Sequence, residues 1–230
     1  VAFPDTATVR EDGANVAIDV LANDTDADTS DMLRGLTVVS AVSAAGATIT
    51  GIGVAGGNII YNPRDIKGFQ SLGVGETTTD TITYRIRDNI NAVSNTSTVT
   101  VTVKGTNDGP IAVDDIAVMG AVYKLREISI GAKHGVLIND IDPDTSDKDL
   151  LEVVPGSAKS FYGADVTFAA DGSYTFNPAV SPILAGLEKH ESLVDTVTYT
   201  VRDPQGATST GTYSITVLGD IPKIELDVDG

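Results

Sequence analysis

The sequence predicts an all-β chain that folds as two tandem antiparallel β-sandwiches. Two observations support this fold class. Apolar and polar residues alternate with a period of two, and the whole pattern occurs twice along the chain. The 230 residues are enough for two domains of ordinary size. No long stretch has the 3.6-residue period of an amphipathic helix.

The alternation is clearest near the end of each half. Val99, Val101 and Val103 alternate with threonines, and the same pattern runs through residues 81–87 and 213–218. Val, Ile, Thr and Tyr at alternate positions are typical of strands with one buried face. Seven strands in about 105 residues, without intervening helices, favour a sandwich of immunoglobulin-like type, although Cys and Trp are absent. The strands expected in the first half cover about Ala7–Arg10, Val16–Leu21, Thr37–Val42, Thr48–Ile52, Asn58–Tyr61, Thr81–Arg87 and Thr98–Lys104.

Helical structure is expected only as short segments. Pro63–Leu72 and Pro178–His190 each follow a proline that suits a first helical turn, and glycine interrupts both.

The two halves match segment by segment. Val20–Asp24 corresponds to Val136–Asp140, and Asp80–Asp88 corresponds to Asp195–Asp203, with an offset near 115 residues. An offset of this size indicates two tandem domains instead of a short-period solenoid. The chain also begins in mid-pattern, so we expect a fragment of a longer protein. The predicted domains are 1–108 and 109–220, and 221–230 is expected to be a linker or the start of a third repeat.

The composition excludes several classes of partner. The net charge is −17, from 32 acidic and 15 basic residues, which argues against nucleic acids and anionic membranes because both bind basic surfaces. No apolar stretch approaches the ~20 residues of a membrane span. There is no Cys, and His134 and His190, the two histidines, are expected on surface loops, so zinc is not expected. We expect a monomer.

An acidic segment occurs once in each half. Asn23–Asp31 and Asn139–Asp147 each hold four carboxylates within eight residues, three of them at alternate positions. Unbalanced charges this close repel one another, and Ca²⁺, which takes 6–8 oxygen ligands, would offset the repulsion. The spacing resembles the start of an EF-hand loop, but glycine at position six and Glu at position twelve are missing. The alternative is a solvated loop in which Asp caps the turns.

Strand parity predicts where the acids gather. Successive strands of a sandwich run in opposite directions. With seven strands, the turns after the first and fifth strands lie at the end where the last strand finishes. The turns after the second and sixth strands lie at the opposite end. Acids of both domains are therefore expected beside the linker, where Ca²⁺ would hold the joint straight. The predicted ligands there are Glu11, Asp80, Asn107, Asp108, Asp115, Asp140, Asp142, Asp144 and Asp203. Asp24, Asp26, Asp28 and Asp88 would form the equivalent half-site before the first domain, and Glu127, Glu191, Asp195 and Asp220 would serve the next junction.

Nothing in the sequence supports an enzyme. There is no nucleophile elbow, no Cys and no Trp-lined cleft. Phe161 and Tyr162 have no partner in the first half and leave an alternative function open: a carbohydrate- or peptide-binding module that uses an exposed face of one domain. The structural explanation for this pair is that one of the two rings packs inward against its own domain.

Three segments together resemble a known family. Asp80–Asp88, the Val/Thr strand Thr98–Val103 and Gly105–Pro110 resemble VCBS and bacterial cadherin-like repeats, as do Val20–Asp28 and Val136–Asp144. The resemblance implies Ca²⁺-binding sandwiches in long secreted or surface adhesins of Gram-negative bacteria, many exported by type I secretion (RTX-type adhesins). In these proteins the repeats act as extenders, contact neighbouring repeats, or bind carbohydrate or surface proteins. The second half departs from the pattern by an insertion at Ala121–Lys133 and by lacking the Glu-Asp-Gly of residues 11–13.

Overall fold

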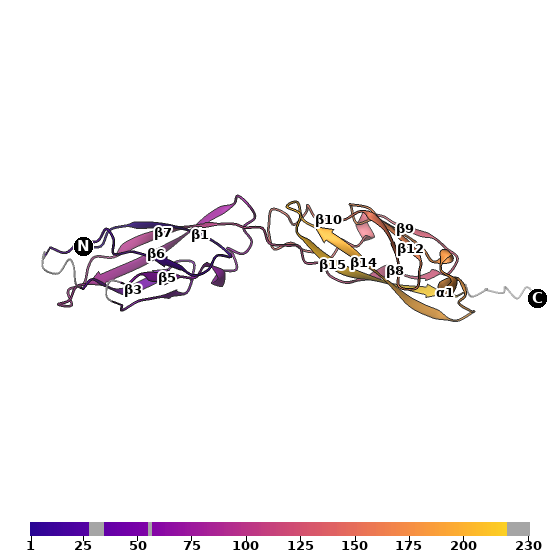
Figure 1. The fold of residues 1–230 in the computed structure, drawn as a ribbon, viewed down its shortest axis with the longest axis horizontal. Coiled ribbons are helices and arrows are strands. Elements are labelled where there is room, and N and C mark those ends of the chain that lie inside the picture. Colours follow the sequence, from indigo (N-terminus) through magenta and orange to yellow (C-terminus); the bar gives the residue numbers. More distant parts are fainter. Residues whose placement is uncertain (28–34, 55–56, 220–230) are drawn as a thin grey trace, which may run out of the picture. The chain divides into compact units, whose positions relative to one another are not determined.

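The computed structural model describes residues 1–27, 35–54 and 57–219 (Figure 1). The chain forms two compact units, the first of Val1–Asn107 with Asp144–Ser146, and the second of Asp108–Pro143 with the residues from Asp147 onward. Each unit is a sandwich of two β-sheets. The predicted linker or third repeat at 221–230 lies outside the described residues.

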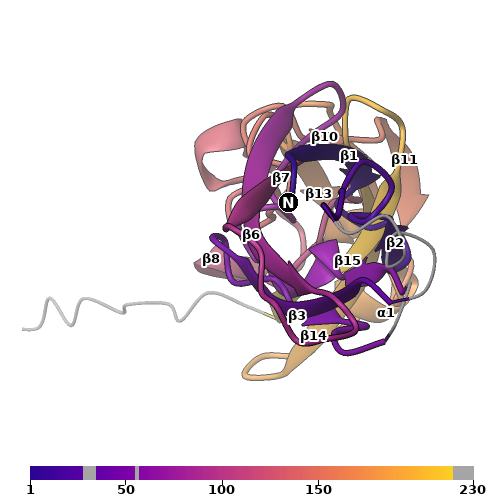
Figure 2. The same ribbon diagram turned by 90° about the vertical axis from the view of Figure 1, so that its left-hand side faces the viewer.

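The first unit has the seven strands that the sequence predicts, in a four-stranded and a three-stranded sheet. One sheet has the order β1-β7-β6-β3 and the other β2-β5-β4, and β1 pairs with β7 in parallel. In the end-on view of Figure 2, β1, β7, β6 and β3 follow one another around one side, with β2 opposite. The strands are β1 (Asp5–Arg10), β2 (Val16–Ile18), β3 (Thr37–Ser43), β4 (Ile49–Thr50), β5 (Ile59–Tyr61), β6 (Thr77–Arg87) and β7 (Ser97–Lys104).

The period-two pattern sets which side chains are buried. Val99, Val101 and Val103 of β7 are completely buried, and the threonines between them face outward or lie half-buried. Ile82 and Tyr84 of β6 lie in the same core. The predicted fold class of tandem antiparallel sandwiches is confirmed.

The second unit repeats this architecture with one added strand. Its sheets have the orders β10-β14-β15-β8 and β11-β12-β13-β9, and β8 pairs with β15 in parallel. β8 shifts register against β15 between Ser214 and Thr216, just before the insertion that the sequence indicates. The strands are β8 (Asp115–Tyr123), β9 (Ile128–Ile130), β10 (Glu152–Val153), β11 (Gly156–Lys159), β12 (Asp165–Phe168), β13 (Tyr174–Asn177), β14 (Ser192–Arg202) and β15 (Thr208–Leu218).

Helical structure is confined to short segments in the described residues. The predicted segments after Pro63 and Pro178 contain the 3₁₀ turns η1 (Pro63–Asp65) and η3 (Pro178–Val180), and α1 (Pro182–Ala185) follows η3. A further 3₁₀ turn, η2, covers Ala132–His134. Among the described residues no helix is both long enough and apolar enough to cross a membrane.

Candidate metal centre

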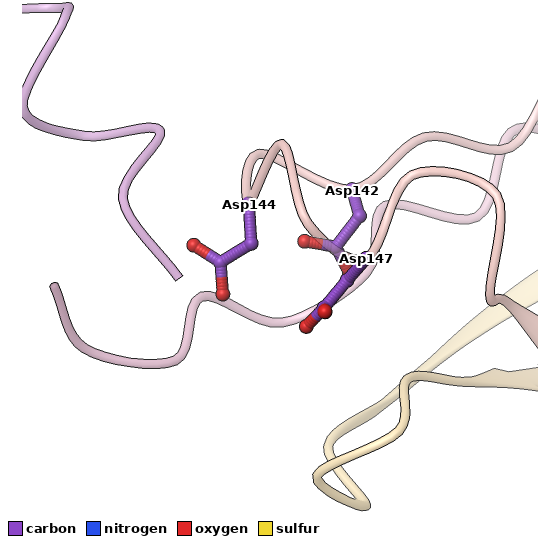
Figure 3. A group of neighbouring side chains, drawn as sticks. All are labelled: Asp142, Asp144 and Asp147. Atoms are coloured by element: carbon purple, nitrogen blue, oxygen red, sulfur yellow. The ribbon is translucent and has the colours of Figure 1, made fainter. Parts of the chain in front are cut away.

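The loop between β9 and β10 brings three carboxylates together (Figure 3). Asp142, Asp144 and Asp147 are buried, and each offers an oxygen within 4.8 Å of those of the other two. Two oxygens on one Ca²⁺ lie no more than about 5 Å apart, because each Ca–O distance is about 2.3–2.6 Å. At 4.8 Å, two unit charges repel by about 3 kcal/mol at an effective dielectric constant of about 20. The spacing therefore fits one shared cation.

Two further oxygens of the same loop lack a hydrogen-bond donor. Asp140 Oδ2 and Asn139 Oδ1 are buried and have no hydrogen-bond partner among the residues that the structure describes. A buried acceptor left without a donor costs free energy, and a cation would satisfy it. Both residues precede the three carboxylates in the same loop, and their side chains offer oxygen, the ligand atom that a hard cation prefers.

Asp140 is also held by the core of the second unit. Its Oδ1 accepts a hydrogen bond from the Val113 amide at 2.7 Å and one from the Tyr199 hydroxyl at 3.3 Å. The same hydroxyl lies 2.7 Å from Asp115 Oδ2. Burial raises the pKa of Asp140 to about 6, and the nearby Asp115 charge adds to this shift. The predicted ligands Asp115 and Asp140 are thus joined through Tyr199, whose hydroxyl the sequence reasoning assigned only to the core.

The first unit contains the same arrangement. The Tyr84 hydroxyl lies 2.9 Å from Asp5 Oδ2 and 3.2 Å from Asp24 Oδ1, and Asp24 Oδ1 accepts the Phe3 amide at 2.7 Å. Burial raises the pKa of both Asp5 and Asp24. Asp5 was missed at the sequence level because it lies outside the acidic segment. The signal available was that Asp5 and Asp115 stand at matching positions, as the first residue of the first strand of each repeat.

Two predicted ligands, Asp88 and Asp203, accept hydrogen bonds from backbone amides of the turns that they begin. Asp88 Oδ1 accepts the amides of Ile90 and Ala92 at 2.9 and 2.8 Å, and Asp203 Oδ1 accepts the Ala207 amide at 2.8 Å. These bonds close the turn after β6 and the turn after β14. Asp26 is half-buried and lines a cavity of about 240 Å³ with Asp88. Asp28 lies outside the described residues.

Glu11 lies at the end of the first unit where β7 finishes. Its side chain is completely buried, and Oε1 accepts the Thr106 amide at 2.6 Å and the Thr106 hydroxyl at 3.3 Å. Asn107 and Asp108, which follow, are half-buried. Glu11 therefore ties the turn after β1 to the segment after β7.

Asp80 is not in the turn where the sequence placed it. β6 begins at Thr77, so Asp80 lies inside the strand, only 2% exposed. Its Oδ2 accepts the hydroxyls of Ser43 and Tyr61 at 2.5 and 2.9 Å, and Oδ1 accepts the Ala45 amide at 3.0 Å. The predicted position is wrong because β6 extends four residues further back than its alternation indicated. In these contacts Asp80 acts as an internal hydrogen-bond acceptor.

Phe161 and Tyr162 behave differently from each other. Phe161 is 76% exposed, and Tyr162 packs against the core of the second unit. The two rings meet edge to face with centroids 4.9 Å apart. One ring therefore packs inward, as the sequence reasoning expected, and Phe161 remains available at the surface.

The comparison with protein families agrees with this architecture. The family model for the bacterial cadherin-like domain matches residues 1–105 and again 107–219. The chain belongs to the bacterial cadherin-like domain family. Two copies of the domain account for nearly all of the chain, which makes it a tandem of cadherin-like modules.

Solved structures with a similar fold are cadherin fragments. Human CDH23 EC21-23 is 15% identical with a TM-score of 0.47, and the match covers 94% of this chain and 67% of that one. Drosophila N-cadherin EC1-4 is 13% identical with a TM-score of 0.46, covering 95% of this chain and 48% of that one. Chicken VE-cadherin EC1-2 is 13% identical with a TM-score of 0.38, covering 94% and 98%. The chain thus spans about half of the Drosophila fragment. No curated protein matches the chain.

Proposed function

We propose that this tandem is a Ca²⁺-binding extender and adhesion module of a large secreted or bacterial surface adhesin. The observation that carries the proposal is the buried group of Asp142, Asp144 and Asp147, whose oxygens lie within 4.8 Å of one another. Family membership supports the extracellular, adhesive role. Proteins of this kind act by position and stiffness, and no catalytic group is required.

The donor set favours Ca²⁺ over other cations. Carboxylate and amide oxygens suit Ca²⁺ and Mg²⁺, and a crowded carboxylate set in a loop suits the higher and more variable coordination of Ca²⁺. Zn²⁺ prefers Cys and His, and this chain has no Cys and two His. When bound, the cation supplies the positive charge that lets the carboxylates of the loop lie close together.

We further propose that Ca²⁺ restrains the joint between the two repeats. Several ligands predicted for this joint lie close to the linker in sequence: the amide Asn107 and the carboxylate Asp108 are within it, and the carboxylate Asp115 follows it. Without a cation the carboxylates repel one another, which favours a spread of orientations of the two repeats. With the cation bound, one orientation is favoured by the binding free energy.

Calcium titration of the whole chain by calorimetry tests this function. We expect saturable binding, a melting temperature several degrees higher in Ca²⁺ than in EDTA, and a narrower distribution of sizes in small-angle scattering. Asp142→Asn should weaken binding by roughly tenfold or more, since it removes one charged ligand.

Asp149→Asn is the matched control, because Asp149 is exposed and lies two residues after the cluster. Its affinity should equal that of the wild type. If Ca²⁺ and EDTA give the same melting temperature and the same scattering, the proposed function is wrong.

A further inference from the structure

A lysine occupies the place of Glu11 in the second repeat. The Glu11 amide donates to the Lys104 carbonyl at 3.0 Å, and the Lys124 amide donates to the Leu218 carbonyl at 2.9 Å. These are the last residues of β7 and β15, which pair with the ends of β1 and β8. Glu11 and Lys124 are therefore structurally equivalent, although the sequence predicts Glu127 in this role.

The surrounding turns are also equivalent. Glu76 accepts the Gly73 amide with its side chain at 3.0 Å, and Glu191 accepts the Glu188 amide at 2.7 Å. The backbone carbonyls of both glutamates accept the amide of the glycine after the last strand, at 3.0 Å in each repeat. The two repeats thus build the same frame at this end and place opposite charges in it.

The charged group of Lys124 makes a hydrogen bond within these turns. Its Nζ donates to the Leu187 carbonyl at 2.5 Å, in a half-buried position. The next position changes too: the acidic Asp12 is replaced by Leu125. Two negative charges are thereby replaced by one positive charge that the chain itself supplies. Glu127, the ligand predicted for this end, is exposed and lies three residues beyond Lys124.

We propose that the Lys124 ammonium takes the place of a metal ion at the C-terminal end of the second repeat, so that this end is stable without Ca²⁺. The inference rests on the proposed function, because it contrasts this end with the Ca²⁺ ligand predicted at Glu11. A fixed ammonium satisfies the Leu187 carbonyl and repels any approaching cation. The chain thus has one repeat with an acidic C-terminal end and one with an internal cation there.

Hydrogen exchange measured by mass spectrometry on the whole chain tests the proposal. In the wild type, exchange of the amides of Lys124, Glu188, Glu191 and Gly219 should be equal in Ca²⁺ and EDTA. Lys124→Met removes the ammonium and keeps the length of the side chain. It should speed exchange at these amides about tenfold, in Ca²⁺ and EDTA alike, which is the order of effect of losing a hydrogen bond from a charged donor.

Lys189→Met is the matched control, because Lys189 is an exposed lysine in the neighbouring turn. It should leave exchange unchanged, and Lys124→Arg, which keeps a cation, should retain most of the protection. The proposal is overturned if Ca²⁺ slows exchange at these amides in the wild type, or if Lys124→Met exchanges like the wild type. The first comparison needs no variant and so does not depend on the folding of Lys124→Met.

The amides of Glu11 and Gly13 serve as the separate readout of the proposed function. If they fail to respond to Ca²⁺ and calorimetry shows no binding, the proposed function fails. The Lys124→Met measurement still decides whether the ammonium stabilises its own end.

Discussion

The two repeats bury the same carboxylate at the same place in the fold and treat it differently. Asp80 in β6 pairs with Val101, and Asp195 in β14 pairs with Ile215. Both oxygens of Asp80 are hydrogen-bonded, but Asp195 Oδ2 has no hydrogen-bond partner among the described residues. Asp195 Oδ1 accepts the amides of Tyr162 and Thr196, each at 2.9 Å.

A missing hydroxyl accounts for part of the difference. The Tyr61 hydroxyl that donates to Asp80 is missing in the second repeat, where Phe176 occupies the equivalent position before Asn177. The second repeat therefore lacks this donor but keeps the buried acceptor. A buried acceptor without a donor costs about 1–3 kcal/mol, so the second repeat carries a penalty that the first avoids.

The largest expected difference between the repeats is in how their stability depends on pH. It comes from Asp140 and Asp24, the carboxylates in contact with Tyr199 and Tyr84. Burial raises the pKa of Asp140 to about 6, from an ordinary value of 3.8, and raises that of Asp24. A raised folded-state pKa means that folding favours the protonated form. The stabilisation is complete below about pH 4 and is lost as the pH rises through about 6.

In Ca²⁺-free buffer, Asp140 should thus stabilise the second repeat on acidification, by up to about 3 kcal/mol between pH 7 and pH 4, at 1.36 kcal/mol for each pKa unit. Thermal unfolding of wild type and Asp140→Asn across this range isolates the contribution, since other carboxyls titrate in both proteins. Asp24→Asn is the comparison in the first repeat, with a smaller expected difference. Equal pH profiles for wild type and Asp140→Asn would contradict the assignment.

Tyr61→Phe should bring the first repeat part of the way toward the second, whose Asp195 Oδ2 has no donor among the described residues. It removes one donor to Asp80 Oδ2 and leaves the Ser43 hydroxyl in place, and we expect a loss of about 1–3 kcal/mol in the first repeat alone. Native-state hydrogen exchange of β6 amides measures the loss, and β14 amides should not change.

Tyr123→Phe is a suitable control because Tyr123 is half-buried and no bond to its hydroxyl is present among the described contacts. It should leave both repeats at wild-type stability. A Tyr61→Phe protein as stable as the wild type would remove the explanation for the divergence.

Phe176→Tyr is the reverse change and should have the opposite sign. The added hydroxyl should donate to Asp195 Oδ2 and stabilise the second repeat by about 1 kcal/mol, the usual net value of one hydrogen bond. The same exchange experiment on β14 amides measures it. A loss of stability would mean that the core around Phe176 has no room for the hydroxyl.

Much of the fold was predictable because it depends on local alternation. The seven strands of the first repeat follow from the period-two pattern, and the valines of β7 are buried at the alternate positions that this pattern predicts. The ends of the strands were less predictable. Thr77–Asp80 are polar, so only the pairing of β6 with Val101–Lys104 reveals that the strand starts there.

The candidate site was predictable only in part, for the same reason. The spacing of Asp142 and Asp144 in one loop placed them together, but the tyrosine that joins Asp115 to Asp140 comes from another strand. Lys124 was missed because the insertion in β8 breaks the sequence offset, and only the backbone pairing with Leu218 restores the equivalence. Contacts between distant segments depend on register, which the sequence alone does not specify.

The smallest expected effect concerns the one exposed ring without a counterpart in the first repeat. Phe161 is 76% exposed, so Phe161→Ala should change the stability of the second repeat by no more than about 0.5 kcal/mol and leave Ca²⁺ binding unchanged. Tyr162→Ala, by contrast, should destabilise it, because that ring packs on the core. A glycan array with wild type and Phe161→Ala then tests the alternative function. A glycan bound by the wild type and lost in Phe161→Ala would give the second repeat a ligand-binding role that the first lacks. If no glycan binds, the carbohydrate-binding alternative is wrong, and the differences between the two repeats are those in cation and hydrogen-bond chemistry.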